Sequence, residues 1–597
     1  MKEELININE GETRTSNKKK KYIFIFFISF ILIEGLAIFL IFILKGKEEN
    51  DEQCKPGYFL QDDNKKSKLY SISNYEISNR IKSNNIYTSE KNYIANDLDE
   101  QKCLIRDNQT NKCLNCESKY YLVDGICKSY SFMATYHSDN KNEEIQIINE
   151  AYRSYIGGVY MNNSNVDIKT SYTFSSIGNH IIYIYINMTS INSLASMFSK
   201  ISKMTSIIFS SEFNTKNIKS MNNMFSNCNS LTSIELSSFD TSSVTIMANM
   251  FFNCSSLISL NLSNFDTSNV IIMNAMFRFC TSLISLDVSN FNTSSVIEMN
   301  SVFSACPSLT SFNLYNFNTS KATGMFGMFS GCTSLSSINL SNFDTSSVTN
   351  MIDMFGFCTS LTELNISNFN TSSVTDMTHI FGGCSSLTSI DISKFDTSRV
   401  TSMQVMFEQC NSLISIDVSN FNTSSVRDMS FMFLNCSSLK SIDLSNFSLV
   451  NTKDMNNMFS NCKSLTSINL PKYKPSSVTN MFNMFSYCGS LPSIDFSNFD
   501  TSSVTIMSNM LYNCSSLTSV NLSTLNIGKL NEINGIFKNC IKLSYIDIST
   551  FHESLKYINE TFENINNSGE IIISKNISTI IHQIFEDLNI DWTITEK

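Results

Sequence analysis

The sequence has little charge, few histidines and no recognisable catalytic motif. Charged residues make up 16% of the 597 residues, against about 25% in ordinary globular domains. Acidic side chains exceed basic ones, 53 to 43, which argues against a nucleic-acid-binding protein because such proteins normally carry a basic patch. G-x-S-x-G, P-loop, Gly-rich nucleotide-loop and H-E-x-x-H motifs are absent, and the five histidines have no recognisable spacing. We therefore expect no enzymatic activity, no catalytic residues and no cofactor.

The one long apolar run, Tyr22–Leu44, predicts a single transmembrane helix. Its 23 residues can cross a bilayer, and 18 of them are Ile, Leu or Phe, which outweighs the cost of Glu34. A cleaved signal peptide has a shorter apolar region that ends in an Ala-x-Ala-like site, whereas this run continues into Lys45. Basic residues are more numerous before the run than after it, so we expect a single-pass plasma-membrane protein with a cytoplasmic N-terminus and residues 45–597 outside the cell.

Five cysteines precede the main body of the chain: Cys54, Cys103, Cys113, Cys116 and Cys127. The stretch from Cys113 to Cys127 resembles one unit of the cysteine-rich repeats of growth-factor-receptor and protist surface proteins. In an oxidising compartment we expect disulfides, because a small loop-rich module cannot bury enough core unaided. Zinc is a weaker alternative, since no second Cys pair or paired histidines lie nearby. The odd count leaves one thiol free or bridging two chains.

From Cys228 onwards, one cysteine recurs every 26 residues, thirteen in all. The unit reads approximately C-x-S-L-T-S-I-[DN]-L-S-N-F-[DN]-T-S-S-V-T-x-M-x-x-M-F-x-x. A fixed period of 20–50 residues indicates a solenoid, in which each unit forms one coil and stacks on its neighbours.

Each part of the unit has a structural interpretation. The alternation around Ile338 and Leu340 predicts a strand with both side chains inward, and the following polar residues predict a turn. Ser347 then caps a short helical stretch, in which Met351, Met354 and Phe355 share one face at i, i+3 and i+4. We therefore expect a parallel sheet on one face of the solenoid and short helical turns on the other.

The phenylalanine, methionine and cysteine columns are expected to be core ladders. Phe343, Phe355, Met351 and Met354 each belong to a column that repeats in most coils. A sulfur-rich aromatic stripe could suggest a cofactor or metal channel, but Met and free Cys are ordinary core residues. Disulfides between neighbouring coils are conceivable, although thirteen cysteines cannot all pair.

The unit resembles the leucine-rich repeats of BspA-like surface proteins, specifically the 26-residue lipoprotein-associated variety. The pattern L-x-x-L-x-L-x-x-N survives as Leu361, Leu364 and Ile366, with Phe369 in place of the final Asn, which argues against the standard Asn-ladder kind. The resemblance implies a right-handed leucine-rich-repeat-like coil and a role in cell-surface adhesion or host and matrix interaction, without chemistry.

The pattern divides the chain into six parts: a cytoplasmic tail (1–21), a transmembrane signal anchor (22–44), an extracellular cysteine-containing stalk (45–129), an N-terminal cap (130–200), the repeat solenoid (201–550) and a C-terminal cap (551–597). In the N-terminal cap, Ser131–Tyr155 predicts a helical middle and His180–Ile186 a strand. In the C-terminal cap, Gly569–Ser574, Ile577–Leu588 and Asp591–Ile594 predict strand, helix and strand. These segments are placed to cover the ends of the solenoid core.

The outward position of the predicted sheet is the candidate binding surface, which we call the sheet face. It is occupied by Glu235, Asn261, Asp287, Asn313, Asn339, Asn365, Asp391, Asp417, Asp443, Asn469, Asp495, Asn521 and Asp547. Stacked like charges repel, so Asp391, Asp417 and Asp443 are expected to hold a cation or to have a raised pKa. Calcium is possible there, but a solvated acidic stripe without metal is favoured. The predicted binding residues are these three with Asp287 and Asp495.

Two classes of function compete. The first is an adhesin or receptor-like ectodomain that binds an extracellular protein or glycan, of host or matrix origin. The second is a structural coat whose surface and glycans shield the cell. Candidate N-glycosylation sites lie in the turns of successive coils: Asn292, Asn318, Asn370 and Asn422. Ligand identity and oligomeric state are not predicted.

Overall fold

The computed structural model describes residues 102–597, except 108, 111, 118–119, 124, 473–475, 531–532, 552–557 and 559. The predicted span Tyr22–Leu44 and Cys54 therefore lie outside the described residues. Within the described part of the chain, no helix is both long and apolar enough to cross a bilayer.

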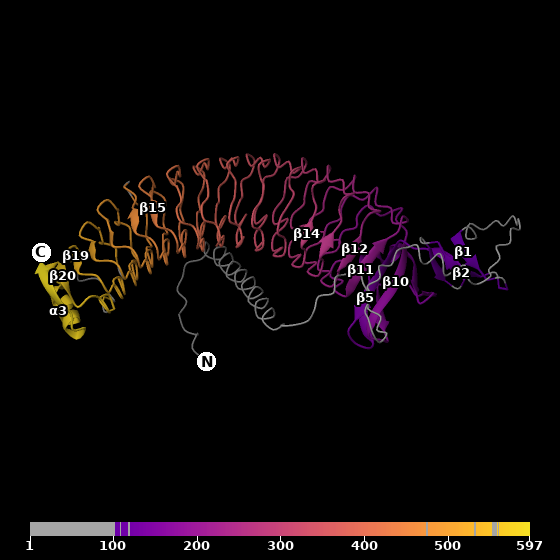
Figure 1. Cartoon of the computed structure of the whole chain (residues 1–597), viewed down its shortest axis with the longest axis horizontal. Helices are drawn as coiled ribbons and strands as arrows, with labels where there is room; N and C mark the ends of the chain where they lie inside the picture. The colour runs from indigo at the N-terminus through magenta and orange to yellow at the C-terminus, as the bar shows by residue number, and fades with distance from the viewer. Residues whose placement is uncertain are drawn as a thin grey trace, which may run out of the picture. The chain divides into compact units, whose positions relative to one another are not determined.

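The repeat region is a parallel β-solenoid, and Figure 1 shows its coils stacked side by side. One face carries short strands that pair in parallel one coil apart, for example Ile442 with Ile468. The strands are β11 (Met204–Phe209), β12 (Ser233–Glu235), β13 (Ser259–Leu260), β14 (Ser285–Leu286), β15 (Ser441–Asp443), β16 (Ser467–Asn469), β17 (Ser493–Ile494), β18 (Ser519–Asn521) and β19 (Tyr545–Ile548). The predicted parallel sheet is confirmed, but it is interrupted. In the described coils between β14 and β15, the one parallel pairing on this face is the bridge between Asn339 and Asn365.

A second ladder of parallel bridges runs along the array without interruption, and the sequence did not predict it. It pairs one residue per coil, from Ser193 and Ser220 at one end to Asn480 and Ile506 at the other. Backbone hydrogen bonds between coils extend it: the N–H groups of Asp353, Phe355 and Phe357 donate to carbonyls of the next coil at 3.0, 3.0 and 2.7 Å.

The predicted helical turns are therefore wrong. Asp353 and Phe357 have φ of 59° and 56°, the left-handed region, whereas a right-handed helix needs negative φ. Each left-handed residue turns the backbone so that alternate N–H groups point to the next coil instead of to the same turn. Ser347 does not cap a helix either, because its Oγ donates to the Ser320 carbonyl of the preceding coil at 3.0 Å. The burial prediction is nonetheless confirmed, since Met351, Met354 and Phe355 are fully buried.

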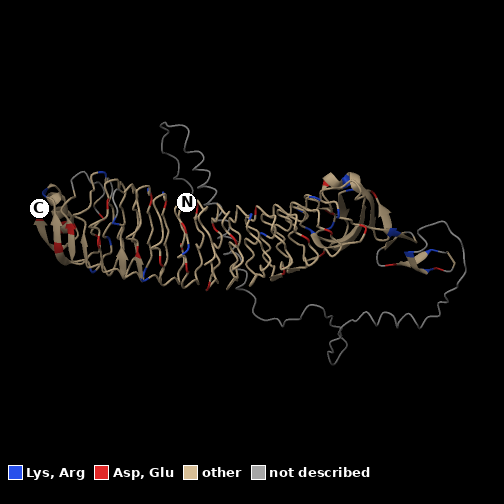
Figure 2. Ribbon diagram, turned by 90° about the horizontal axis from the view of Figure 1, so that it is seen from above, with Lys and Arg blue, Asp and Glu red and all other residues tan. Residues whose placement is uncertain are grey.

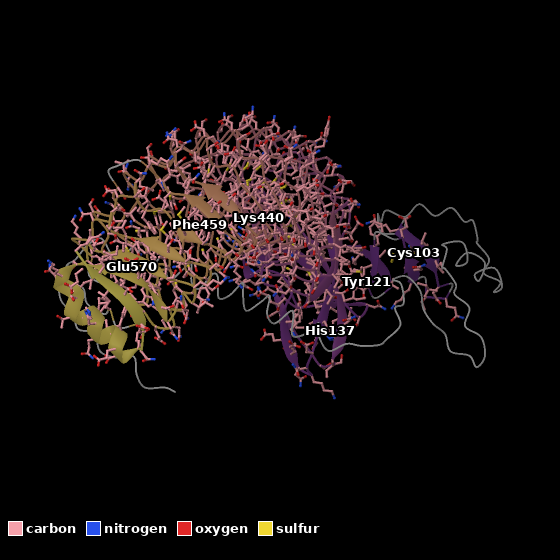
Figure 3. The ribbon with its side chains drawn as sticks, turned by 60° about the vertical axis from the view of Figure 1, so that its left-hand side comes forward. Cys103, Tyr121, His137, Lys440, Phe459 and Glu570 are labelled. Atoms are coloured by element: carbon pink, nitrogen blue, oxygen red, sulfur yellow. A yellow bond between two sulfur atoms is a disulfide. The ribbon has the colours of Figure 1, made fainter. Side chains whose placement is uncertain are left out.

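The interior of the array consists of stacked columns, as predicted. The Phe355 ring lies 5.7 Å from Phe329 and 6.0 Å from Phe381 between ring centroids, and the rings are nearly parallel. All thirteen repeat cysteines are buried and free, and their thiols donate to backbone carbonyls, as Cys358 Sγ does to Phe329 at 3.2 Å. Figure 3 labels Phe459, which is fully buried, in the same column.

An asparagine ladder exists, although the sequence pattern argued against one. The ladder residue is Asn368, immediately before Phe369, and its Nδ2 donates to the carbonyls of Leu340 at 3.1 Å and Phe343 at 2.7 Å in the preceding coil. Equivalent contacts recur at Asn264, Asn290, Asn342 and Asn420. The asparagine that bonds to the preceding coil therefore stands one residue earlier in the unit than in the standard pattern.

The N-terminal cap is a mixed sheet that continues from the first coil. Its order is β12-β11-β5-β10-β7-β8, with β5 (Phe132–Ser138), β7 (Ile156–Met161), β8 (Ser164–Val166) and β10 (Gly178–Ile186). A separate antiparallel pair consists of β6 (Glu143–Gln146) and β9 (Ser171–Phe174), and the 3-10 helix η3 spans Glu150–Tyr155. The strand predicted at His180–Ile186 is confirmed. The helical middle predicted for Ser131–Tyr155 is wrong, because the strands β5 and β6 occupy the beginning and the middle of this segment and the one helical turn, η3, lies at its end.

The cysteine module contains two antiparallel strand pairs: β1 (Cys103–Arg106) with β2 (Cys113–Cys116), and β3 (Tyr120–Val123) with β4 (Ile126–Ser129). It contacts the cap through Tyr121, which is labelled in Figure 3. The Tyr121 ring stacks on Tyr183 at 3.7 Å between centroids, and its hydroxyl accepts the N–H of Asn163 at 2.8 Å.

The C-terminal cap adds two strands to the parallel sheet. The strand, helix and strand predicted there are confirmed as β20 (Ser568–Ile573), α3 (Ser578–Asp587) and β21 (Asp591–Glu596), with the 3-10 helix η4 (Lys575–Ile577) before α3. Trp592 is buried against the core. The last coil is thereby covered, since β19 pairs with β20 and β20 with β21.

Candidate ligand-binding surfaces

The five predicted binding carboxylates, Asp287, Asp391, Asp417, Asp443 and Asp495, are all exposed on the sheet face. Each Oδ1 accepts the backbone N–H of the serine two residues later, at 2.8 to 3.0 Å. These serine hydrogen bonds lower the pKa of all five carboxyl groups. The raised pKa expected for Asp391, Asp417 and Asp443 is therefore wrong, because local donors and solvent outweigh repulsion between neighbouring coils.

The calcium alternative gains no support from the geometry of this column. Among the described residues, the one group of three or more His, Cys, Asp or Glu with ligand atoms within 4.8 Å of one another is Cys103, Cys113 and Cys127. Asp547, also predicted to face outward, is buried at 3% exposure beneath the C-terminal cap, and Lys597 Nζ lies 3.3 Å from its Oδ2.

The cysteine module holds two disulfides, Cys103–Cys113 and Cys116–Cys127. Four of the five disulfide candidates are thus paired, and Cys54 lies outside the described residues. The sulfurs of Cys113 and Cys127 are 3.3 Å apart. This contact between the two disulfides brings the sulfurs of Cys103, Cys113 and Cys127 as close together as the ligands of a metal ion. Because thiolate is the form that binds metal, these oxidised sulfurs do not constitute a zinc site.

The four candidate glycosylation residues, Asn292, Asn318, Asn370 and Asn422, are exposed in the turns. Each Oδ1 accepts the N–H of the serine two residues later at 3.1 Å. The amide therefore lies at the surface in the same turn conformation in each of these coils.

Sequence reasoning missed a second acidic column, which lies on the continuous bridge ladder. Asp376, Asp428 and Asp454 occupy bridge positions there. Burial raises the pKa of Asp428, with repulsion from Asp454 and Asp376 acting in the same direction. An alternation of inward and outward residues, as in a strand, would identify this column in the sequence. The i, i+3, i+4 spacing of the Met and Phe residues beside it instead predicts a helix.

One histidine lies within the array, and its site was also missed. His379 Nδ1 is 2.6 Å from Asp353 Oδ1, and both residues are left-handed residues of neighbouring coils. Gly356 and Gly382 make room for the pair: a Cβ on Gly356 would lie 1.8 Å from Asp353 Oδ1, and one on Gly382 would lie 2.1 Å from His379 Cδ2. The pair joins two coils, and among the described residues it belongs to no group of three or more candidate metal ligands.

The charged residues are scattered along the coils in both signs, as Figure 2 shows. The described array therefore presents no single basic stripe of the kind that binds nucleic acid. The exposed positions of the array recur every 26 residues.

Comparisons with known proteins bear on the repeat. Among solved structures, the chain is similar to the crystal structure of a TLR13–ssRNA13 complex, with 14% identity, a TM-score of 0.17, and coverage of 64% of this chain and 62% of that chain. The match thus spans less than two thirds of that protein. No curated protein matches the chain.

Five overlapping segments of the chain match one family of repeat proteins: residues 171–282, 252–363, 354–468, 385–493 and 453–575. Together they cover residues 171–575, which is more than half of the sequence and includes every coil with a repeat cysteine. This chain therefore belongs to the family described as "Mycoplasma protein of unknown function, DUF285".

Proposed function

We propose that this chain is a non-catalytic binding protein, held at the cell surface by Tyr22–Leu44, that contacts an extracellular protein or glycan through its sheet face. The resemblance of the unit to BspA-like surface repeats supports this role. So does the general use of extended solenoid faces for binding. The partner belongs to a host, to a matrix or to another cell.

The observation that carries the proposal is the row of ionised carboxylates at Asp391, Asp417 and Asp443. They occupy the same position of three consecutive coils, all are exposed, and hydrogen bonds lower the pKa of each. The three residues recur every 26 positions, once per stacked coil, so the row presents negative charge at regular intervals. Serines on either side keep the face flat, which suits a partner with a complementary basic surface.

The test replaces Asp391, Asp417 and Asp443 together with Asn. The full chain should be made in a bacterial host, because each new Asn precedes x-Ser and would become a glycosylation site elsewhere. We expect adhesion to cells and matrix to be lost while folding is kept, since Asn already occupies this position in neighbouring coils such as Asn339 and Asn365.

A matched control changes Asp240, Asp344 and Asp396 to Asn. These carboxylates are exposed in the turns, also have a lowered pKa and carry the same hydrogen bond to a serine. The control removes the same charge from another surface. An equal loss of adhesion in both triple variants would show that overall charge, and not the sheet face, determines binding.

A structural coat is the second candidate, and a specific observation favours it. Four exposed sheet-face asparagines, Asn261, Asn339, Asn365 and Asn521, also precede x-Ser. Glycans at these positions would cover the face that the first proposal uses. Native protein that carries glycans there and binds neither cells nor matrix would support the coat.

A further inference from the structure

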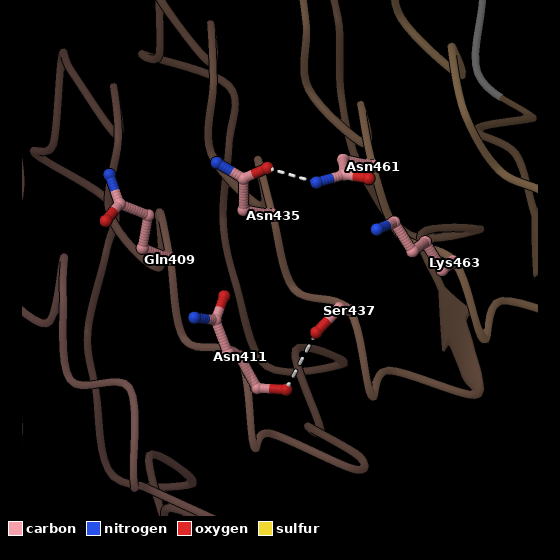
Figure 4. Close-up of a pocket in the computed structure, with 6 residues that line it drawn as sticks. All are labelled: Gln409, Asn411, Asn435, Ser437, Asn461 and Lys463. Carbon is pink, nitrogen blue, oxygen red and sulfur yellow. Dashed lines mark hydrogen bonds between the residues drawn. The ribbon is translucent and has the colours of Figure 1, made fainter.

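A polar hollow lies on three successive coils, at the left-handed turns and apart from the sheet face. Its volume is about 350 Å³, and Figure 4 shows the six residues that line it: Gln409, Asn411, Asn435, Ser437, Asn461 and Lys463. They form two columns, because one residue precedes and one follows each of the buried thiols Cys410, Cys436 and Cys462.

The lining consists of amides, a hydroxyl and an ammonium group. Asn461 Nδ2 donates to Asn435 Oδ1 at 2.6 Å, and Ser437 Oγ donates to the Asn411 carbonyl at 3.3 Å. The backbone N–H groups of Asn435 and Asn461 bond to the next coil at 2.9 and 2.7 Å. The two side chains therefore stand on a backbone that is already ordered, which lowers the entropy cost of binding.

An aromatic ring continues the first column. The residue 26 positions after Asn461 is Tyr487, which is 43% exposed, and its ring lies edge-on to Tyr512 at 5.2 Å between centroids. The residue 26 positions after Lys463 is Gly489, and a Cβ there would meet just Ser515 Oγ, at 3.3 Å. No side chain at position 489 covers the Tyr487 ring.

We propose that this hollow and the Tyr487 ring bind a neutral oligosaccharide. Amides and hydroxyls both donate and accept hydrogen bonds, as sugar hydroxyls do, and an exposed tyrosine offers an apolar face for the C–H side of a sugar ring. Cations are a poor fit, because none of the six lining residues is a carboxylate. Protein partners commonly anchor aromatic side chains in desolvated pockets, and a hollow lined by these polar residues matches a sugar better.

This proposal extends the proposed function and rests on one part of it, namely that the chain is a binding protein at the cell surface. It uses a different surface, so the two can be tested separately. The test measures binding of hexasaccharides of glucose, mannose and N-acetylglucosamine to the full chain, made in bacteria and kept in a detergent without a sugar head group.

Two substitutions remove the proposed sugar contacts. Each introduces a residue that other coils already carry at the same position of the unit. Tyr487→Asn places the residue found at Asn435 and Asn461, and Lys463→Ser places the residue found at Ser437. We expect each to raise the Kd of the bound hexasaccharide by about tenfold. The matched control is Tyr315→Ser, because Tyr315 is 79% exposed away from the hollow and serine occupies its column in neighbouring coils.

The outcomes separate the two proposals. Sugar binding that is weakened by Tyr487→Asn and Lys463→Ser, but not by Tyr315→Ser or by the sheet-face triple variant, supports the oligosaccharide site. No binding to any hexasaccharide, or binding that survives both hollow variants, overturns it. Adhesion that depends on Asp391, Asp417 and Asp443 in a chain that binds no sugar leaves the proposed function in place and removes this inference alone.

Discussion

Two left-handed residues in each coil set the backbone geometry of the array. They stand four positions apart, for example Asn457 and Asn461 with φ of 54° and 64°. Asparagine and glycine tolerate this region at the lowest cost, which accounts for their frequency at these positions. Val405 adopts the same conformation with φ of 52°, although a β-branched residue is strained there, and its N–H bond to Ser430 in the next coil at 3.0 Å offsets that cost.

The sign of the change in stability caused by Gly383→Ala tests this backbone geometry. Gly383 has φ of 75°, and a Cβ would lie 3.1 Å from the backbone of Phe357. We expect destabilisation by about 1–3 kcal/mol, because strain in this region is of that size. A helix would respond in the opposite way, since alanine stabilises a helix relative to glycine by about 0.5–1 kcal/mol. Denaturant unfolding of the variant and the parent chain distinguishes the two signs.

Phe355→Ala tests the core column. Its ring is fully buried between those of Phe329 and Phe381, so truncation should cost about 3–5 kcal/mol. Ser341→Ala is the control, because Ser341 is exposed in the preceding turn. A cost below about 1 kcal/mol for Phe355→Ala, measured by the same denaturant unfolding, would contradict the packing described here.

At the scale of the elements, burial protects each cysteine of the repeat column from modification of its thiol. Burial raises the pKa of Cys280, Cys332 and Cys384 to about 12, and thiolate is the reactive form. In the folded chain at neutral pH, a maleimide should therefore leave the thirteen repeat thiols unlabelled, whereas in denaturant it should label all of them. The measurement is intact mass of the Cys54→Ser variant, which removes the one cysteine outside the described residues. Labelling of repeat thiols in the folded chain would show that coils open.

The same column makes stability depend on pH. In the unfolded chain a thiol ionises near pH 8.5, whereas in the fold Cys280 stays protonated up to about pH 12. The unfolded state therefore binds fewer protons as pH rises through this range, so the free energy of unfolding should fall. Denaturation under reducing conditions at pH 8 and pH 10 measures the decrease. Replacing Cys280 and Cys332 with Ala should make the decrease smaller.

The elements also show which structural features the sequence could predict. Inward positions were predictable, because apolar columns such as those of Met351 and Phe355 must be buried whatever the backbone does. The backbone between them was not, since a spacing of i, i+3 and i+4 suits a helix and a pair of left-handed turns equally. For the same reason, repulsion was expected among the exposed residues Asp391, Asp417 and Asp443 and not at Asp428, which lies on the unrecognised ladder.

The sheet-face carboxylates have a consequence for acid stability. Serine hydrogen bonds lower the pKa of Asp391 and Asp417 in the folded chain. Their contribution is therefore present above the unfolded pKa of about 3.9 and is lost as pH falls from there through the lower folded pKa. The triple replacement with Asn should accordingly show no gain in stability at neutral pH and less acid sensitivity than the parent. A clear gain in thermal stability at neutral pH would indicate repulsion after all.

At the scale of the whole molecule, topology is the first question for experiment. If residues 45–597 are outside the cell, protease added to intact cells should cleave the repeats and leave the N-terminal tail intact. Glycosidase treatment should reduce the apparent mass if the cell glycosylates Asn292, Asn318, Asn370 and Asn422. Protection of the repeats in intact cells, with cleavage after lysis, would reverse the proposed orientation.

The unbroken bridge ladder from Ser193 to Ile506 joins each coil that it spans to the next through the same position of the unit. Adding or deleting one unit of 26 residues therefore shifts one end by about 4.8 Å without creating a new kind of interface. Recombination between such similar units could change the unit number while both caps remain intact. The length of the array can therefore change in fixed steps while the backbone contacts between neighbouring coils stay the same.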